Sequence, residues 1–377
     1  DAIGRPLSVT SSGLPTQYSR YLLASDGSHA PTHAVLMTRA QSAGTPIQES
    51  YNDSLGRPLR GAVAGFDGSY QYADKSYDNL GHLLKASQPY TAGLTPYTTT
   101  FGGFDSLDRP TWRTLPHGLR SDYAYDGLTT NITVGSDARA MSRTYSSAGW
   151  LLATSDAQQG TNRFSYDGAG RPLIIEDANG NQIVASYNGF GHKTQVDDPN
   201  QGLTTFGYST LGELVSQTAN GVTQTFSQDT LGRTTTRTTT GGHAPGTATF
   251  TWDTAKTGLL SSEAENGITR TYSYTNQLQL GQLSVNVDGT TRTIKHQYDS
   301  VLGRPKALEY PNGLTLEYRY NDQGYLTHTR NAVSHYTYRE VTAMADTGQI
   351  TGAKLANNLM AQTSHFNRDA GTMSYTT

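Results

Sequence analysis

The chain has 377 residues, a formal net charge of −3 and no cysteine. So small a charge imbalance argues against nucleic acid or an anionic membrane as the main partner, and the lack of cysteine excludes a disulfide framework and thiol chemistry. No apolar run is long enough to span a bilayer. The 24 tyrosines and 40 glycines, with many threonines, are typical of an all-β chain that turns often.

The chain begins with an incomplete copy of a motif that recurs along the sequence. A full copy has a tyrosine, a turn that ends in glycine and often Arg-Pro-Leu after it. Residues 1–7 read Asp-Ala-Ile-Gly-Arg-Pro-Leu, which is the later motif without its tyrosine, so we expect the chain to begin inside a repeat of a longer parent. Residues 16–50 are irregular, and we predict further strands there. The motif is clear from Tyr51 to Leu59, where the wider spacing predicts a turn one residue longer than in later repeats. At Asp108 an aspartate replaces the turn glycine, and aspartate tolerates left-handed backbone better than most residues.

The stretch from residue 145 to residue 232 is the most regular part of the chain. Its turn glycines are each 21 residues apart, and the last one follows after 20. A fixed period of this size is the signature of a repeat protein. The glycines concerned are Gly149, Gly170, Gly191, Gly212 and Gly232.

Residues 166–187 show how one repeat is built. Asp167 can accept a hydrogen bond from the backbone two residues on, and Gly170 supplies the left-handed conformation that closes the turn. Pro172 suits the first position of a strand, where its missing N–H does least harm, and the Asn-Gly pair at 179–180 predicts a second, hairpin turn. Each unit is therefore predicted to hold two antiparallel strands of about five to seven residues. The frequent Gly and Pro argue against helices.

Beyond Gly232 the pattern loosens. Residues 234–260 form a degenerate repeat whose threonine-rich start, 234–240, predicts either a strand or a mobile loop. Residues 339–363 look the most helical, but glycines spaced by 23 or 24 residues favour a degenerate β repeat. Because repeats run almost from end to end, residues 1–377 are predicted to form a single continuous segment of β-sheet.

The pattern Tyr-Asp-x-x-Gly-Arg occurs in about a dozen lines that are in phase, such as Tyr166–Leu173 and Tyr298–Pro305. It resembles the RHS, or YD, repeat family, which includes bacterial Rhs proteins, the B and C components of insecticidal Tc toxins and, more distantly, the animal teneurins. The resemblance implies a long β-ribbon that spirals into a hollow shell, of which this chain would be a fragment. In the toxin members the shell holds a cytotoxic C-terminal segment until delivery.

The resemblance also implies an aspartic self-cleavage site, formed in the family by paired Asp-Pro motifs that follow the repeats. This sequence departs from that pattern, because its only Asp-Pro is Asp198-Pro199, in an ordinary second turn and without a partner motif. We therefore carry over no protease and predict that the chain is not an enzyme. Two close carboxyl groups with raised pKa values in a cleft would revive an enzymatic interpretation.

The number of repeats also argues for a sheet that coils. About fifteen units of two strands give roughly thirty strands, and twisted open sheets rarely exceed about ten strands without curling. Hydrophobic residues make up only 34% of the chain, which favours a single layer with little dry interior. The repeated tyrosines are predicted to stack on one another across strands, one per unit.

The turn aspartates could bind calcium, since Asp-rich turns supply oxygen ligands. One carboxylate per repeat, however, favours the plainer interpretation of a turn acceptor. The aspartates concerned are Asp78, Asp105, Asp167 and Asp299. The pair His29 and His33 could bind zinc, but Pro31 rules out a shared helical face and no third ligand is evident, so surface loop residues are favoured.

Aromatic residues two apart lie on one face of a strand, as in Phe164 with Tyr166 and Tyr272 with Tyr274. Such a face could bind sugars, although packing of the tyrosines is the favoured interpretation. We predict no catalytic, cofactor-binding or metal-binding residue.

The sequence thus predicts a structural shell segment of a secreted bacterial RHS-repeat protein, located outside the cell or on its surface, with no cofactor. The shell would enclose a toxin or another polypeptide, such as a C-terminal segment of its own parent. The alternative is an extracellular glycan-binding or cell-adhesion module. Open strand edges would permit self-assembly, and neither nucleic acid nor a membrane span is expected.

Overall fold

The computed structural model describes residues 5–10, 16–135, 139–158, 160–300, 302–367 and 372–376. The incomplete motif predicted at residues 1–7 lies partly outside them. Contacts divide the chain into two units, each described here by itself: unit 1 is residues 1–120 with 294–377, and unit 2 is residues 121–293. That residues 1–377 form a single continuous segment stays a prediction.

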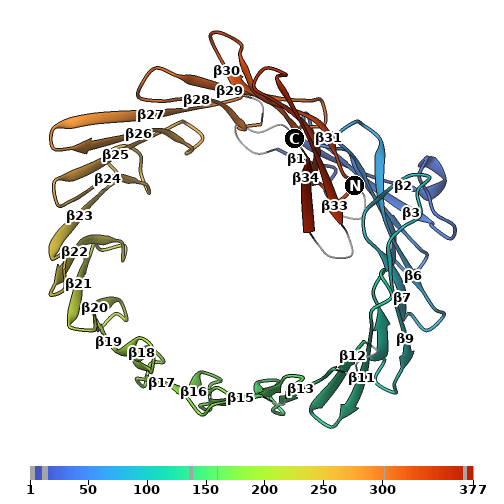
Figure 1. The fold of residues 1–377 in the computed structure, drawn as a ribbon, viewed down its shortest axis with the longest axis horizontal. Coiled ribbons are helices and arrows are strands. Elements are labelled where there is room, and N and C mark those ends of the chain that lie inside the picture. Colours follow the sequence, from blue (N-terminus) through green and yellow to red (C-terminus); the bar gives the residue numbers. More distant parts are fainter. Residues whose placement is uncertain are drawn as a thin grey trace. The chain divides into compact units, whose positions relative to one another are not determined.

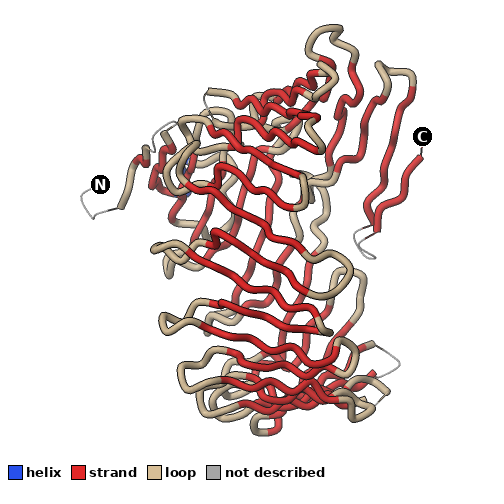
Figure 2. Tube along the Cα trace, turned by 90° about the vertical axis from the view of Figure 1, so that its left-hand side faces the viewer, coloured by secondary structure: helices blue, strands red, loops and turns tan. Residues whose placement is uncertain are grey.

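Nearly every regular element is a β-strand. The described residues form 34 strands and one 3₁₀ turn, η1 (Ala24–Asp26), and they contain no α-helix (Figure 2). No helix in this part of the chain is long and apolar enough to cross a membrane. The all-β prediction is confirmed, including the degenerate stretches 16–50, 234–260 and 339–363. The threonine-rich residues 234–240 are a strand and not a mobile loop.

Unit 2 is a meander in which each strand pairs antiparallel with the next one along the chain. Its strands are β11 (Arg120–Asp126, which begins at the last residue of the first part of unit 1), β12 (Thr129–Val134), β13 (Arg139–Tyr145), β14 (Leu151–Ser155), β15 (Thr161–Tyr166), β16 (Pro172–Glu176), β17 (Gln182–Tyr187), β18 (Lys193–Asp198), β19 (Gly202–Tyr208), β20 (Leu214–Ala219), β21 (Val222–Gln228), β22 (Thr234–Thr240), β23 (Gly246–Trp252), β24 (Leu260–Glu265), β25 (Ile268–Tyr274) and β26 (Leu280–Val287). Within this unit, strands β13 to β22 follow one another side by side in one layer (Figure 1).

The 21-residue period consists of two hairpins of different kinds. β15 and β16 pair with a bulge just before Tyr166, which then lies opposite Pro172 at the start of β16, as predicted for a proline. The next pair, β16 with β17, has no register shift. The same bulge precedes Tyr187 and Tyr208. A bulge bends the strand and increases its twist, so the bend recurs once per repeat.

The turn after each tyrosine closes through a left-handed residue. The values of φ are +83° at Gly149, +81° at Gly170, +89° at Gly191 and +86° at Gly212. The four repeats therefore share the local geometry that the period predicts. Asp108 takes the same position at +60°, as expected for an aspartate, and Leu278 does so at +63°, where a Cβ atom is strained.

The two faces of unit 2 differ in chemistry, because side chains alternate along each strand. One face, the tyrosine face, carries the tyrosines that end the strands. The other, the hydroxyl face, carries serines and threonines that pair between neighbouring strands. Thr218 lies 3.0 Å from Thr223 and Thr238 lies 3.1 Å from Thr247, each pair joined through the hydroxyl oxygens.

Unit 2 has almost no buried core. Within its described residues only Ser121, Ala248 and Ser261 are buried. Unit 2 is therefore a single layer of strands, as the low hydrophobic content of the sequence predicts.

Unit 1 is also built from neighbouring antiparallel strands, with one exception: β8 pairs with β6, while β7 pairs with β9. Its strands are β1 (Ser8–Val9), β2 (Gln17–Leu23), β3 (Leu36–Gln41), β4 (Gln48–Asn52), β5 (Pro58–Ala64), β6 (Tyr70–Tyr77), β7 (Leu83–Ser87), β8 (Tyr90–Thr91), β9 (Thr98–Phe104), β10 (Pro110–Thr114), β28 (Pro305–Glu309), β29 (Thr315–Tyr320), β30 (Leu326–Asn331), β31 (Thr337–Met344), β32 (Ile350–Leu355), β33 (Met360–Asn367) and β34 (Thr372–Thr376), and β27 (Thr290–Tyr298) crosses the boundary with unit 2.

Unit 1 contains a small core, in which η1 packs on the sheet. Ala24 of η1 meets Met37, Tyr51 and Ala62, and all four are almost completely buried. Ala34, from the loop between η1 and β3, packs against the same group. The sheet has a second layer at this place because the loop folds back over it.

Tyr51 is buried because β4 is shifted by one residue. The bulge lies between Tyr51 and Asn52, so Asn52 stands opposite Pro58, where other repeats place their tyrosine. The turn itself is of ordinary length, since the N–H of Gly56 donates to the carbonyl of Asp53 at 3.0 Å. The predicted longer turn after Tyr51 is therefore wrong: the additional residue is in the strand, and it rotates the tyrosine to the opposite face.

In an antiparallel meander the turns alternate between two edges. Turns that follow the tyrosine strands form one edge, which we call the aspartate-turn edge. The turns between them form the other, the second-turn edge. The loops in Figure 2 mark these two edges of the strands.

In unit 1 the two edges meet in a contact that we call the seam. Asn321 Nδ2 donates to the carbonyl of Phe66 at 2.7 Å, and the Tyr325 hydroxyl donates to the carbonyl of Ala64 at 3.1 Å. The carbonyl of Gly44 lies so close to Gly324 that position 324 has no room for a larger residue, and the Leu302 side chain lies against Gly44. Hydrogen bonds at the seam join residues 255 to 261 apart in the sequence, so the strip of strands returns to its own edge.

The left-handed turn position allows a direct test of the repeat geometry. Gly149→Ala is expected to cost about 1–2 kcal/mol of unfolding free energy through backbone strain alone, because no atom lies within 4 Å of the added Cβ. Gly168→Ala is the matched control, since its φ is not positive and its surroundings are equally open. It should stay within about 0.5 kcal/mol of wild type. Leu278→Gly should stabilise the chain. Urea unfolding measures all three, and equal effects of the two alanines would contradict the assignment.

The seam can be tested with a second matched pair of glycines. Gly324 and Gly313 have nearly the same φ, +86° and +85°, but only Gly324 lies against the backbone of Gly44. Gly324→Ala should therefore cost about 1–3 kcal/mol more than Gly313→Ala. Because the chain has no cysteine, spin labels on Ser42→Cys and Asp322→Cys report the seam directly. Their distance distribution should broaden in the Gly324 variant alone, and a sharp distribution there would show that the seam tolerates the methyl group.

Candidate functional site

Each aspartate of a tyrosine turn is fully engaged within its own repeat. Asp167 Oδ1 accepts the N–H groups of Ala169 at 2.9 Å and Arg171 at 3.0 Å, and its Oδ2 accepts Arg171 Nε at 2.6 Å. The same arrangement recurs with Asp53 and Arg57, Asp105 and Arg109, and Asp229 and Arg233.

The predicted role of these aspartates as turn acceptors is confirmed. At Asp78 the partner is His82, and at Asp299 it is Arg304, in a turn that is one residue longer. Within the described residues no group of three or more His, Cys, Asp or Glu side chains could hold a metal ion. The absence of metal-binding residues itself stays a prediction.

In the regular repeats, the tyrosines that end the strands pack on the turn of the preceding repeat and not on one another. Arg171 lies over the ring of Tyr187, 5.1 Å from its centroid, and His192 stacks on Tyr208 at 4.8 Å. The hydroxyl of Tyr187 donates to the carbonyl of Pro172 at 3.0 Å, 15 residues back. The predicted stacking of tyrosine on tyrosine is therefore wrong for these repeats. Successive tyrosines are two strands apart, about 10 Å, which exceeds the 4.5–7 Å of ring contact, and the turn side chain fills the gap.

The most buried polar side chain of unit 1 is Glu49, on β4. It accepts hydrogen bonds from Tyr51 at 2.7 Å and Arg39 at 2.8 Å, and it lies 3.0 Å from His29 Nδ1. Burial alone would raise the pKa of Glu49, but its three neighbours hold that pKa below the usual value. Burial and the bond to Glu49 raise the pKa of Tyr51. Glu49 is thus a stabilised anion under the loop and not an acid poised to give up a proton.

A second polar cluster follows on the same face. Arg60 holds both carboxylate oxygens of Asp74, at 2.6 and 2.7 Å, and lies over the ring of Tyr72, 4.3 Å from its centroid. The Tyr90 hydroxyl donates to Asp74 at 2.6 Å. Burial and this bond raise the pKa of Tyr90 to about 12. The bond from Tyr90 to this pair anchors β8 on β6 and helps to hold β8 outside the meander order.

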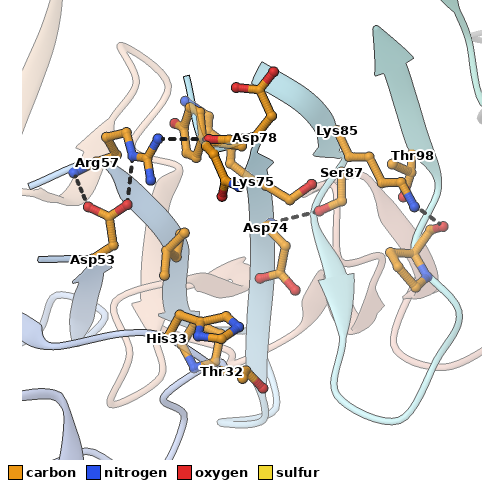
Figure 3. A pocket seen from close by; sticks show the side chains of 16 residues that line it. Thr32, His33, Asp53, Arg57, Asp74, Lys75, Asp78, Lys85, Ser87 and Thr98 are labelled. Atoms are coloured by element: carbon orange, nitrogen blue, oxygen red, sulfur yellow. Dashed lines mark hydrogen bonds and ion pairs between the residues drawn. The ribbon is translucent and has the colours of Figure 1, made fainter. Parts of the chain in front are cut away.

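A pocket of about 620 Å³ opens beside these clusters on β5, β6 and β7 (Figure 3). Its wall combines His33 from the loop before β3 with Asp74, Lys75 and Lys85 from the strands. Arg57 donates to the carbonyl of Asp78 at 3.2 Å along one side.

The carboxylates of the pocket are already paired, namely Asp53 with Arg57, Asp74 with Arg60 and Asp78 with His82. Among the described residues Lys75 and Lys85 form no ion pair. The pKa is lowered from its ordinary value at Glu49, Asp53, Asp78, Asp105 and Asp167 alike. The raised pair of carboxyl pKa values that an acid–base site would need does not occur among them.

The structure separates the two histidines that could have bound zinc. His29 stacks on Tyr70, with ring centroids 4.0 Å apart, and faces Glu49. It is therefore packed, and the prediction of a surface loop residue is wrong for it. His33 lines the pocket with a φ of +70°. In the described part of the chain, neither histidine belongs to a group of three or more side chains that could hold a metal ion.

Asp198-Pro199 occupies an ordinary second turn, as predicted. Asp198 ends β18, and its Oδ1 accepts the N–H of Asn200 at 2.8 Å. The carboxylate is used to close the turn.

Sequence reasoning did not predict the clusters around Glu49 and Arg60. A signal exists only in part: charged or tyrosine residues stand two apart in β4 and in β6, which places them on one face. What makes the clusters is the loop between η1 and β3 that covers them, and the covering of a strand by a distant loop leaves no local pattern.

The turn carboxylates make stability depend on pH in the acid range. The backbone N–H of Arg171 lowers the pKa of Asp167, burial opposes it, and the Arg171 guanidinium lowers it further. Arg233 holds the pKa of Asp253 at about 2. Because the folded-state pKa values are depressed, the stabilisation is complete above the unfolded value of about 4 and is lost as pH falls through the folded values. We expect the urea midpoint to fall steadily between about pH 4 and about pH 2.

Asp167→Asn separates the two functions of the carboxylate. Asn188 closes its own turn by accepting the N–H groups of Phe190 and His192, both at 3.0 Å, so asparagine keeps the turn and loses the ion pair. This variant should lose less stability than wild type between pH 7 and pH 3, whereas Asp167→Ala should be the less stable of the two variants at pH 7. An unchanged pH dependence in Asp167→Asn would show that this carboxylate does not contribute.

Comparison with known proteins shows which sequence model and which solved structures the chain is similar to. A search of curated proteins returned no match. A sequence model described as RHS Repeat matches residues 145–182. Among solved structures, the chain is similar to the Tc holotoxin pore of Photorhabdus luminescens, with 13% identity and a TM-score of 0.73 over 90% of this chain and 21% of that one. It also matches a TcdB2-TccC3 complex without its hypervariable C-terminal region, with 15% identity and a TM-score of 0.49 over 88% of this chain and 24% of that one.

The chain thus spans about a fifth to a quarter of the length of these structures. At 13% identity the first of them shows the fold alone. The sequence match lies in the most regular repeats, and the shared fold extends through most of the other described strands. Residues 145–182 thus carry the RHS repeat, and the chain shares the fold of the Tc holotoxin pore.

Proposed function

We propose that the chain is a wall segment of a shell in a toxin complex, outside the cell, and that the shell encloses a polypeptide such as a toxin segment. The seam carries the proposal. A strip of strands that meets its own edge after 255 to 261 residues forms a wall that is sealed where the edges touch. The similar Tc holotoxin pore is a toxin complex, which supports a toxin segment as the class of cargo.

The single layer of unit 2 supports the same function. A wall needs two faces that tolerate water, and the described residues of unit 2 bury almost nothing. Its hydroxyl face includes paired serines and threonines, as in Ser284 with Thr293 at 2.9 Å. Such pairs satisfy one another and expose little apolar surface. An unfolded polypeptide beside these pairs would find few apolar contacts to hold it.

The wall performs no catalysis in this proposal. The carboxylates of the tyrosine turns and of the pocket are committed to arginine, histidine or backbone partners. The glycan-binding alternative stays a prediction. One ring face of Tyr187 and of Tyr208 is covered by a turn side chain, which leaves less aromatic surface for a sugar than the sequence suggests.

Small-angle X-ray scattering of the full chain tests the hollow wall. A compact globule of this length has a radius of gyration of about 21 Å, and a hollow wall must exceed that value because its mass lies far from the centre. The distance distribution should rise late and peak well beyond half of the largest distance, whereas a compact globule peaks near the middle. A radius near 21 Å with a symmetric distribution would remove the container function while leaving the repeat fold intact.

Protection from protease tests the cargo. An unfolded reporter peptide joined after Thr377 should be cleaved at least tenfold more slowly than the same peptide on the Gly324→Ala chain, in which the seam is open. The Gly313→Ala chain is the matched control and should protect like wild type. Equal cleavage in all three chains would overturn the container, and binding of a glycan panel to a chain that fails to protect would favour the adhesion alternative.

A further inference from the structure

A row of large apolar side chains lies exposed on the aspartate-turn edge. Each occupies the position directly before the left-handed residue of its turn. In unit 1 they are Leu55, 74% exposed, Leu80, 84%, and Leu107, 68%. In unit 2 they are Phe190, 89%, Leu211, 85%, and Leu231, 73%. We call these residues the turn tips.

The turn itself does not require an apolar residue at the tip. The tip contributes its backbone N–H, which donates to the turn acceptor, as Leu231 does to Asp229 at 2.9 Å. Ala169 makes the same bond to Asp167 at 2.9 Å with a single methyl group as its side chain. Single exposed leucines are common on protein surfaces, but here the same exposed position is filled with a large apolar side chain six times.

The seam shows what covers this position. Leu302 is the tip of the turn closed by Gly303, and its side chain contacts Gly44 on the second-turn edge. It is half-buried, unlike the six exposed tips. Gln323, the next tip along the chain, lies beside Gly68. At the seam, therefore, tips of one edge seat on left-handed glycines of the other edge, where the lack of a Cβ leaves room.

The rest of the second-turn edge offers similar seats. Gly118, Gly180 and Gly221 are all left-handed, and within the described residues no atom lies within 4 Å of the place a Cβ would take. The two kinds of residue that meet at the seam therefore also occur elsewhere in the described part of the chain without a partner strip: exposed tips on one edge and open glycines on the other.

We propose that the exposed turn tips of unit 2 are a docking surface for the second-turn edge of another RHS strip. These tips occupy the same position of the repeat as the tips that the seam covers in unit 1, which argues for the same kind of occupant. Such contacts join unlike edges and are heterologous. This surface is distinct from the open strand edges from which the sequence predicts self-assembly, and it does not depend on whether a polypeptide is enclosed.

A second copy of the chain is the probe, because one copy carries both edges. Analytical ultracentrifugation of the full chain should show self-association that strengthens with concentration. The triple variant Phe190→Ser, Leu211→Ser and Leu231→Ser should raise the dissociation constant at least tenfold. A control triple at exposed apolar residues on strand faces, Leu152→Ser, Val184→Ser and Leu203→Ser, should change it less than twofold. Circular dichroism and thermal unfolding confirm that each variant is folded.

Disulfide trapping identifies which edges meet, since the chain has no cysteine of its own. A Leu231→Cys chain mixed with an Asn179→Cys chain should form mixed disulfides in excess over both homodimers. Three results would overturn the proposal: a wild-type chain that stays monomeric up to its solubility limit, equal effects of the two triple variants, or a Leu231→Cys chain that links mainly to itself.

Discussion

The carboxylate that closes each tyrosine turn is the interaction on which the rest of the strip depends. Asp167 holds the backbone of its turn and also orients Arg171. The guanidinium then lies over Tyr187 of the next repeat, whose hydroxyl returns to the carbonyl of Pro172. The Asp167 carboxylate therefore connects its own turn, through the Arg171 guanidinium, to the ring of Tyr187. The hydroxyl of that tyrosine then connects back to the preceding strand. Since unit 2 has almost no core, this line of contacts and the strand ladder keep the layer in register.

The variants within the chain show what that line of contacts requires. Where the tyrosine is replaced, Gln228 donates to Leu214 at 2.7 Å, and Trp252 donates to Thr234 at 2.9 Å, in both cases to a backbone carbonyl. The last position of the strand therefore requires a side chain whose hydrogen-bond donor reaches the backbone carbonyl, and it does not require a tyrosine. Where the aspartate is replaced by Ser209, its acceptor bonds lengthen to 3.2 Å. Bonds to a charged acceptor are shorter and stronger than neutral ones, so the repeats differ in how firmly their turns are closed.

The period of the sequence predicted where the strands and turns lie better than it predicted which side chains contact one another. The 21-residue spacing located the strands and the left-handed glycines, because both depend on local backbone chemistry. It could not locate the bulge beside Tyr51, since counting from tyrosine to glycine does not distinguish an additional strand residue from an additional turn residue. It also misjudged the partner of each tyrosine, which is a question of distance across strands. The clusters at Glu49 and Arg60 escaped entirely, because they exist only where a distant loop covers the sheet.

A single layer has few places to bury apolar side chains, so the places where they gather indicate what the layer touches. In unit 1 the core cluster forms where η1 and its loop fold over the strands. The hydroxyl face of unit 2 is paired within itself and does not require a neighbour. Both long edges consist of turns, so they present no row of unpaired strand groups to which any strand could add. Contact at these edges must use side chains and turn carbonyls, as at the seam, where Tyr325 bonds to Ala64 and Leu302 meets Gly44. A strip with left-handed glycines at matching intervals fits such an edge, because each glycine leaves room for a turn tip, as Gly44 does for Leu302.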